Sequence, residues 1–259
     1  MVYNYKLTIK KQLIMSLNLY GMNPQIYDDY ISTAIEKINF DKVFTIIEQL
    51  YEQKKKLKIL DLCCGTGIFP RKWLIKLDNI TYKGVDINQN FIDFANTNLA
   101  NNKFQFIVND ALTYNTNEKF DLIIATSSYH HIIDENKRKY LNNIYLHLQD
   151  DGYLLIYEKM VDKFNDRIEA VDCGTKFYLE RIKYILKSEN ISDNQMFALF
   201  NELYLTAIRH DEYKVDFDYL LNDLDYCNLK LKEYFKLWPD TNVFKNEMVG
   251  DFVFIIQKT

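Results

Sequence analysis

The sequence predicts a doubly wound α/β fold, and three observations support this. Short apolar segments alternate with amphipathic helical segments between residues 57 and 158, which is the pattern of a mostly parallel sheet with helices on its faces. Residues 120–125 are apolar on both faces, as a central parallel strand requires. Only 7 Gly and 3 Pro occur among 259 residues, which disfavours collagen-like, linker-rich and many-turned all-β chains.

The chain begins with a segment of irregular pattern, followed by helical periodicity. Two apolar stripes between residues 25 and 53 predict two helices, the second of them starting at Asp41 as N-cap. We therefore expect residues 1–53 to form an N-terminal arm with helices and residues 54–259 to form one α/β domain. At this length the chain can bury a sizeable core without disulfides.

The central part contains the elements of the sheet. The expected strands are 57–62, 80–85, 104–108, 120–125 and 153–157, and the expected helices between them are 69–77, 88–99 and 134–148. Right-handed crossovers place the loops that follow parallel strands at one edge of the sheet, where ligands bind in this fold class. Side chains at these strand ends are therefore the candidates for a binding site.

The last hundred residues change pattern twice. Three apolar stripes at helical spacing between about residues 160 and 225 predict a helical insertion, with Ser192 and Gln195 as a capping box. Residues 229–235 and 251–257 then read as two final strands. An insertion at this point would lie over the strand ends as a helical cap.

Charge and cysteine usage narrow the function classes. The net charge of −4 gives no general attraction to nucleic acid or to an anionic membrane. The run from Lys54 to Lys58 is interpreted as a solvated helix end.

The four cysteines have neither a disulfide framework nor metal-ligand spacing, so we expect reduced thiols and no metal. Neither a secretory signal nor a membrane span is evident, and a cytoplasmic protein is the expectation.

Three strand ends carry acidic residues in a regular order. Asp61 begins the run Asp-Leu-Cys-Cys-Gly-Thr-Gly after the first strand, and glycine there allows the backbone to approach a ligand closely. Asp86 ends the second strand 25 residues later, and Asp110 follows the third strand after another 24 residues. A carboxylate in the position of Asp86 suits a ribose diol. Each of these residues could instead cap a turn or the next helix.

In these motifs the sequence resembles the class I S-adenosylmethionine-dependent methyltransferases. DLCCGTG is similar to their first motif, with Cys63 in place of its first glycine, and GVDI and NDA resemble the second and third motifs. The stretch from Phe120 to His131 resembles their fourth strand and the loop that faces the transferred methyl group. The resemblance covers about residues 40–160, and it implies a seven-stranded, mostly parallel sheet whose last strand is antiparallel.

The resemblance implies a site for S-adenosyl-L-methionine. In that family the first loop holds the methionine part of the cofactor, the second motif holds the ribose, and the third holds the adenine amine, with apolar side chains against the ring. The cofactor-binding residues implied are Asp61, Cys63, Gly65, Gly67, Asp86, Ile87, Asn109, Asp110, Ala111 and Ser127.

The same edge of the sheet supplies candidates for catalysis and substrate binding. His130 and His131 follow the fourth strand, and a histidine can take a proton from an acceptor near neutral pH. Either could instead only pack beneath the cap, and the sequence does not distinguish between them. The candidate substrate residues are Tyr129, Glu158, Arg209, His210 and Tyr213. Tyr27, Tyr30 and Tyr178 are further aromatic residues that could line a pocket.

The functional expectation is methyl transfer to an oxygen or nitrogen atom of a small molecule in biosynthesis, by in-line displacement in a capped pocket. One alternative is an enzyme similar to carboxy-S-adenosylmethionine synthase of tRNA modification, for which Arg181 or Arg209 would have to hold a carboxylate. A second is a non-catalytic, cofactor-binding partner protein. A nicotinamide dehydrogenase is disfavoured because Pro70 stands where its third glycine is required. Monomer and homodimer both remain open.

Overall fold

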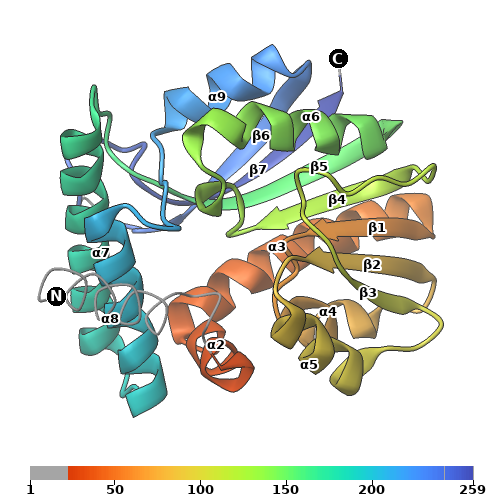
Figure 1. Cartoon of the computed structure of the whole chain (residues 1–259), viewed down its shortest axis with the longest axis horizontal. Coiled ribbons are helices and arrows are strands. Elements are labelled where there is room, and N and C mark those ends of the chain that lie inside the picture. Colours follow the sequence, from red (N-terminus) through yellow and green to blue (C-terminus); the bar gives the residue numbers. More distant parts are fainter. Residues whose placement is uncertain (1–22, 242, 259) are drawn as a thin grey trace, which may run out of the picture.

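The computed structural model describes residues 23–241 and 243–258, and its centre is one seven-stranded sheet (Figure 1). The strand order is β3-β2-β1-β4-β5-β7-β6. β1 to β5 run parallel, whereas β7 is antiparallel to both β5 and β6. The bounds are β1 Leu57–Leu62, β2 Ile80–Asp86, β3 Phe104–Val108, β4 Phe120–Thr126, β5 Leu148–Met160, β6 Leu229–Trp238 and β7 Gly250–Lys258. The predicted fold class is confirmed.

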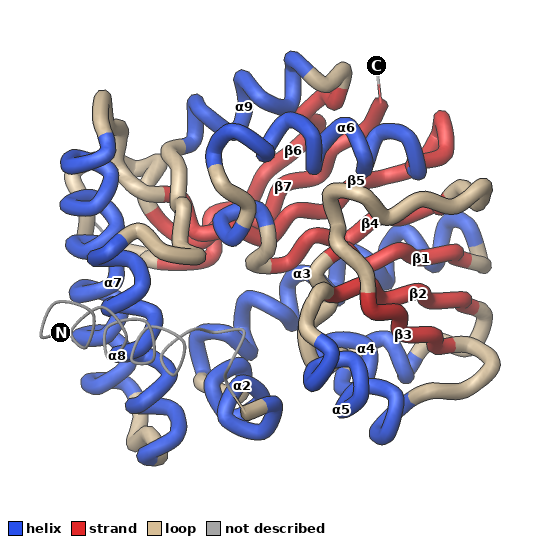
Figure 2. The backbone as a smooth tube through the Cα atoms, in the orientation of Figure 1, coloured by secondary structure: helices blue, strands red, loops and turns tan. Residues whose placement is uncertain are grey.

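Helices cover both faces of the sheet (Figure 2). One face packs against α3 (Ala34–Lys54), α4 (Ile68–Lys72) and α5 (Gln89–Leu99), and the other against α6 (Lys137–His147) and α9 (Phe217–Tyr226). Each face buries its own apolar cluster because the strands alternate their side chains between the two sides. Short 3₁₀ turns at Leu74–Lys76, Tyr129–His131 and Asp134–Asn136 complete the connections.

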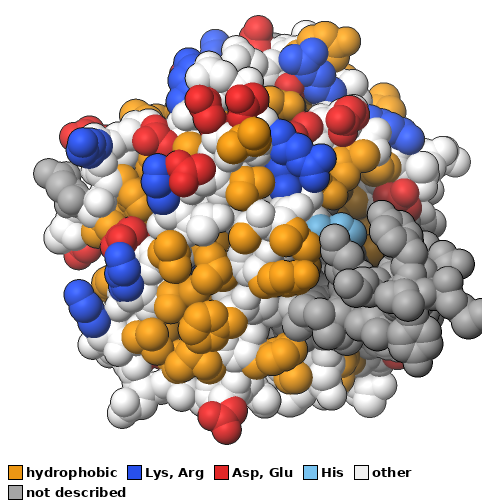
Figure 3. Space-filling model, turned by 60° about the vertical axis from the view of Figure 1, so that its left-hand side comes forward, with side chains coloured by type: hydrophobic (Ala, Val, Ile, Leu, Met, Phe, Trp, Pro, Cys, Tyr) orange, Lys and Arg blue, Asp and Glu red, His pale blue; other side chains and the backbone are white. Residues whose placement is uncertain are grey.

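Two long helices form the cap. α7 (Arg167–Ser188) and α8 (Asp193–Ile208) pack side by side, and α8 also packs against the short helix α2 (Pro24–Ile31). α8 starts with the predicted capping box of Ser192 and Gln195. Apolar side chains remain exposed on α7 and α8, and hydrophobic side chains gather on this side of the molecule in Figure 3.

The third predicted helix of the insertion does not belong to the cap. α9 packs on β6, and the ring of Phe217 lies 5.5 Å from that of Phe252 and 5.3 Å from that of Phe254. Its apolar face therefore completes the sheet rather than the cap. We therefore use the name cap for the pair of helices α7 and α8.

The N-terminal helices divide earlier than the sequence pattern indicates. α2 ends at Ile31 and α3 starts at Ala34, with Thr33 as its N-cap, so Asp41 lies inside α3 instead of starting a helix. The Asp41 carboxylate accepts a hydrogen bond from the Trp73 indole at 2.7 Å. This tertiary contact accounts for an acidic side chain that resembles a cap in the sequence. Within the described residues, none of the helices combines the length and apolar character needed to span a membrane.

Candidate active site

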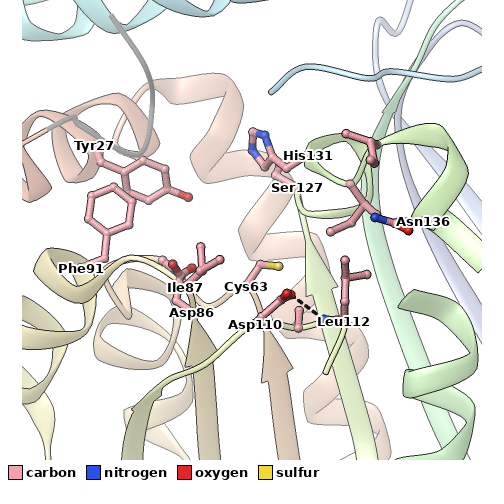
Figure 4. Close-up of a pocket in the computed structure, with 14 residues that line it drawn as sticks. Tyr27, Cys63, Asp86, Ile87, Phe91, Asp110, Leu112, Ser127, His131 and Asn136 are labelled. Carbon is pink, nitrogen blue, oxygen red and sulfur yellow. Dashed lines mark hydrogen bonds between the residues drawn. The ribbon is translucent and has the colours of Figure 1, made fainter. Parts of the chain in front are cut away.

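A cavity of about 270 Å³ opens at the carboxyl ends of the parallel strands (Figure 4). This is the edge that the crossover rule predicts for ligand binding. The residues that line the cavity are Tyr27, Cys63, Gly65, Asp86, Ile87, Phe91, Asp110, Ala111, Leu112, Ser127, His131, Ile132, Ile133 and Asn136. Nine residues named from the sequence meet there: Tyr27, Cys63, Gly65, Asp86, Ile87, Asp110, Ala111, Ser127 and His131.

The loop after β1 presents its backbone to the cavity. Cys63 and Gly65 both have positive φ, at 71° and 56°, so the chain turns sharply between the strand and α4. The Cys63 amide donates to the Val85 carbonyl at 2.8 Å, and the Gly65 amide donates to the Asp86 carboxylate at 2.8 Å. The second strand thereby holds the first loop in place.

Gly67 and Asp61 belong to the same motif but do not line the cavity. A Cβ on Gly67 would lie 2.8 Å from the Phe106 ring, so this glycine lets α4 approach the sheet. Asp61 is buried behind the loop, where it accepts a hydrogen bond from the Tyr82 hydroxyl at 2.7 Å. Burial raises the pKa of Asp61 to about 7, although the Tyr82 hydrogen bond acts in the opposite direction.

Asp86 and Asp110 point into the cavity from neighbouring strand ends (Figure 4). Asp86 also accepts the Asn88 amide at 2.8 Å, just before the helix that Asn88 caps. Asp110 accepts the Leu112 amide at 2.8 Å through Oδ1, and its Oδ2 accepts no hydrogen bond within residues 23–258 as far as these are described. Burial raises the pKa of Asp86, while the backbone amides of Asn88 and Gly65 oppose this shift.

This lining fits an adenosyl compound. Two carboxylates can accept hydrogen bonds from ribose hydroxyls and from an exocyclic amine, because each oxygen has more than one acceptor position. Ile87, Ala111, Leu112 and Phe91 supply apolar surface for a purine ring. A cavity with apolar walls and few polar groups is typical of a small-molecule site.

Helix α2 supplies one wall of the cavity through Tyr27, which the sequence named as a candidate together with Tyr30 and Tyr178, and these last two do not line the cavity. Tyr27 lines the cavity, and its ring centroid lies 5.3 Å from that of Phe91. The next residue, Asp28, accepts hydrogen bonds from the Thr66 hydroxyl at 2.6 Å and from Arg71 at 2.5 Å. Asp28 therefore links α2 to the glycine loop. The lining residues absent from the prediction are Phe91, Leu112, Ile132, Ile133 and Asn136, which all follow a predicted motif closely in the chain.

The two histidines have different surroundings. The His131 ring faces the cavity, and its Nδ1 lies 2.6 Å from the Asp211 carbonyl oxygen. His130 is buried beneath it and pairs through Nδ1 with the Glu158 carboxylate. Burial, together with the nearby lysines Lys214, Lys159 and Lys137, holds the pKa of His130 well below its usual value, so its ring is neutral at physiological pH. Only His131 is placed to meet a ligand in the cavity.

Glu158 supports the histidine turn from below. Its carboxylate accepts the backbone amides of His130 at 3.0 Å and of Lys159 at 2.9 Å. Both the ring and the backbone of His130 are thus held by one carboxylate at the end of β5. Burial raises the pKa of Glu158, against the effect of Lys159.

The other predicted substrate residues lie outside the cavity. Tyr129 is fully buried and donates to Asp223 at 2.7 Å, and Arg209 donates to Asp134 at 2.5 Å. His210 lies near Asp211 on the surface, whereas the Tyr213 amide donates to the His130 carbonyl at 2.6 Å. Asn109 also does not line the cavity. Their predicted roles in binding stay predictions.

Three side chains near the cavity could in principle hold a metal ion. His130, His131 and Glu212 offer ligand atoms within 4.8 Å of one another. However, Glu212 already forms an ion pair with Lys214, and the His131 Nδ1 must carry a proton to approach a carbonyl oxygen. These contacts favour a hydrogen-bonded cluster over a metal centre.

Comparisons with known proteins indicate a methyltransferase domain in this part of the chain. Residues 59–152 match the family model described as methyltransferase domain. A malonyl-[acyl-carrier protein] O-methyltransferase from Ilyobacter polytropus is 29% identical over 134 residues, which cover 51% of this chain and 47% of that protein. The chain thus spans about half the length of this curated relative.

Several solved structures match almost the whole chain. The plantazolicin methyltransferase BpumL, in complex with SAH, aligns with a TM-score of 0.61 at 16% identity, covering 98% of this chain and 97% of that one. At this identity the likeness concerns the fold.

A different relative is the tRNA modification GTPase MnmE of Ureaplasma parvum. It is 26% identical over 201 residues, which cover 68% of this chain and 41% of that protein. The GxxxxGK[ST] phosphate-binding sequence does not occur in this chain.

Proposed function

We propose that this chain, whose residues 59–152 match a methyltransferase domain, is a class I enzyme that transfers a methyl group from S-adenosylmethionine to an oxygen or nitrogen atom of a small molecule. The observation that carries the proposal is the meeting of Asp86, Asp110 and His131 at one cavity. The carboxylates suit the adenosyl half of the cofactor, and the histidine stands on the β4 side of the same cavity. The acceptor would enter between His131 and Tyr27.

The bound cofactor supplies an electrophilic methyl group on a sulfonium and leaves as the neutral thioether. In this proposal the backbone of Cys63 and Gly65 would hold the methionine part of the cofactor. The Asp86 carboxylate would accept hydrogen bonds from the ribose hydroxyls, and the Asp110 carboxylate would accept one from the adenine amine. The acceptor atom forms the new bond to carbon while His131 Nε2 takes its proton. Holding the acceptor in line beside the methyl group is the main contribution expected of the protein.

The histidine favours a hydroxyl or amine acceptor over a carboxylate. A carboxylic acid is already deprotonated at neutral pH, so its methylation needs no base, whereas a hydroxyl or ammonium group must lose a proton. His131 is available for this role because its Nε2 has no hydrogen-bond partner within the described residues. The Ilyobacter relative is named for malonyl-[acyl-carrier protein], and that acceptor is the first to compare with alcohols and amines.

For the alternative of a carboxylated cofactor, neither of the two arginines considered for the extra carboxylate is free among the described residues. Arg181 is fully buried and donates to Glu36 and Asp251, and Arg209 donates to Asp134. Both arginines that the alternative requires are thus already paired with carboxylates. This supports unmodified S-adenosylmethionine as the ligand.

Calorimetry with S-adenosylhomocysteine tests the proposal directly. The wild-type protein is expected to bind it, and Asp86→Ala is expected to weaken binding by about 1.5–3 kcal/mol, the usual worth of hydrogen bonds to a charged group. Asp93→Ala, an exposed change on the neighbouring helix α5, is the matched control and should bind normally. Absence of binding to the wild-type protein refutes the proposal.

A further inference from the structure

We propose that Glu212 is a positioning residue for His131. The Asp211 carbonyl fixes the hydrogen of the His131 ring on Nδ1, and the Glu212 carboxylate stabilises the positive charge that the ring acquires when it acts as a general base. This inference deepens the proposed function and rests on it. It concerns the loop between α8 and α9, from which no residue lines the cavity. The loop acts through contacts with the histidine turn.

The loop is attached to the histidine turn by two hydrogen bonds that run in opposite directions. The Tyr213 amide donates to the His130 carbonyl at 2.6 Å, and His131 Nδ1 donates to the Asp211 carbonyl at 2.6 Å. A carbonyl oxygen can only accept, so Nδ1 carries the hydrogen. In the neutral ring the lone pair is therefore on Nε2, which is the atom left to accept a proton from a ligand.

Glu212 lies directly behind the two rings. Its side chain is completely buried, with Oε1 3.8 Å from His131 Nδ1 and Oε2 3.7 Å from His130 Nε2. Oε1 accepts no hydrogen bond from the described residues, whereas Oε2 pairs with Lys214. A buried carboxylate oxygen without a donor is costly, and a positive charge on His131 would stabilise it. Glu212 thus favours the protonated ring that proton transfer from the acceptor creates.

Other charged groups moderate this effect. His130 lies with its ring centroid 4.1 Å from that of His131 and is neutral, as argued above. The carboxylates of Asp86 and Glu158 also interact with the His131 charge, and Asp211 pairs with His210. Lys214 forms an ion pair with the Glu212 carboxylate and so weakens the attraction of Glu212 for a positive charge on His131. The further cations around the turn are Lys137 and Lys159.

This balance predicts opposite responses to two neighbouring substitutions. Glu212→Gln removes a negative charge beside the ring, so the titration of His131 should move to lower pH than in the wild-type protein. Lys214→Met leaves the Glu212 charge uncompensated, so the titration of His131 should move to higher pH. A purely structural role for Glu212 would not produce shifts of opposite sign.

Histidine-selective NMR titration of the full-length protein provides the measurement, since the chain has only four histidines. Ring nitrogen shifts should identify the neutral form of His131 as the Nδ1–H tautomer, and Glu233→Gln, an exposed change on β6, should leave its titration unchanged. The double variant Glu212→Gln/Lys214→Met leaves neither buried charge unpaired, so it remains informative if a single variant does not fold. Its His131 pKa should lie near the wild-type value.

Three results would overturn the inference: an Nε2–H tautomer, shifts of the same sign in the two single variants, or no shift in either. Tight binding of added Zn²⁺ with loss of the His130 and His131 signals would overturn it too, because the cluster would then be a metal site. The titration needs no cofactor. Failure of S-adenosylhomocysteine binding with the expected titration would therefore refute the proposed function and leave the role of Glu212 standing.

Discussion

Asp61 and Asp86 end neighbouring parallel strands, yet the two carboxylates have different partners. Asp86 accepts two backbone amides and faces the cavity, whereas Asp61 has one tyrosine donor and a second oxygen, Oδ1, without a donor among the described residues. An ionised carboxylate with so few donors is unfavourable in a buried site. Ionisation of the buried Asp61 carboxyl group should therefore lower the free energy of unfolding of the ligand-free protein.

The pKa of about 7 for Asp61 predicts how stability depends on pH. Between about pH 4 and pH 7 the folded protein retains a proton that the unfolded chain releases. This group should therefore lower the free energy of unfolding as pH rises through that window, with no further effect above it. Asp61→Asn removes the titration and should flatten this part of the dependence. The free energy of unfolding of both proteins is measured with denaturant at pH 5 and pH 8. An equal change between the two pH values in both proteins would contradict the prediction.

At the scale of elements, α2 connects the glycine loop to the cap. Asp28 holds Thr66 and Arg71 on one side, and on the other side Tyr30 donates to Glu202 of α8 at 3.0 Å. Gln195 of α8 also donates to the Asp29 carbonyl at 3.0 Å. A short helix with partners on both sides can transmit the state of the cofactor loop to the cap.

Asp28→Asn should loosen α2 and weaken cofactor binding. The change leaves Arg71 without its charged partner and costs about 1.5–3 kcal/mol for the lost charge-assisted bonds. Hydrogen exchange of the α2 amides is expected to accelerate, and S-adenosylhomocysteine should bind more weakly by calorimetry. Asp29→Asn changes the adjacent, less buried carboxylate and serves as the control. If both variants exchange alike, the link through Asp28 is wrong.

At the scale of the whole molecule, one buried arginine joins three distant parts of the chain. Arg181 of α7 donates to Glu36 of α3 at 2.6 Å and to Asp251 of β7, and all three side chains are fully buried. Burial by itself would raise the pKa of Glu36, but Lys159 and Arg181 lower it to about 2. The cap is therefore attached to the sheet by charges that depend on one another.

Arg181→Met should destabilise the protein far more than an exposed arginine substitution. It leaves two buried carboxylates without their cation, for which about 3–5 kcal/mol is typical. Arg138→Met removes an ion pair to Asp223 in which the arginine side chain is 49% exposed, and a much smaller loss of stability is expected because water screens the exposed charge. Chemical denaturation of the two variants measures the difference. Similar losses would show that Arg181 does not anchor the cap.

The strands and the cofactor motifs were predictable because they are local. Period-two and continuous apolar patterns identify strands, and Gly65, Asp86 and Asp110 stand immediately after them, so the crossover rule alone brings these residues to one edge. The division of α2 from α3 was wrong in the sequence interpretation because Asp41 resembles an N-cap and its true partner, Trp73, is distant in the chain. The assignment of α9 to the cap was also wrong, because Phe217 of α9 packs against Phe252 and Phe254, which are distant from it in the chain.

The fold class, the edge of the sheet where the cavity opens, and two of the three acidic strand ends expected there could be predicted, since each depends on residues close together in the chain. The three-dimensional structure was needed to show which histidine faces the cavity, that Tyr27 but neither Tyr30 nor Tyr178 lines it, and that Glu212 lies behind His131. These facts depend on the packing of loops and helices that are far apart in the chain. No local periodicity or propensity encodes such contacts, because they arise from the way that separate apolar faces and buried charges are satisfied together.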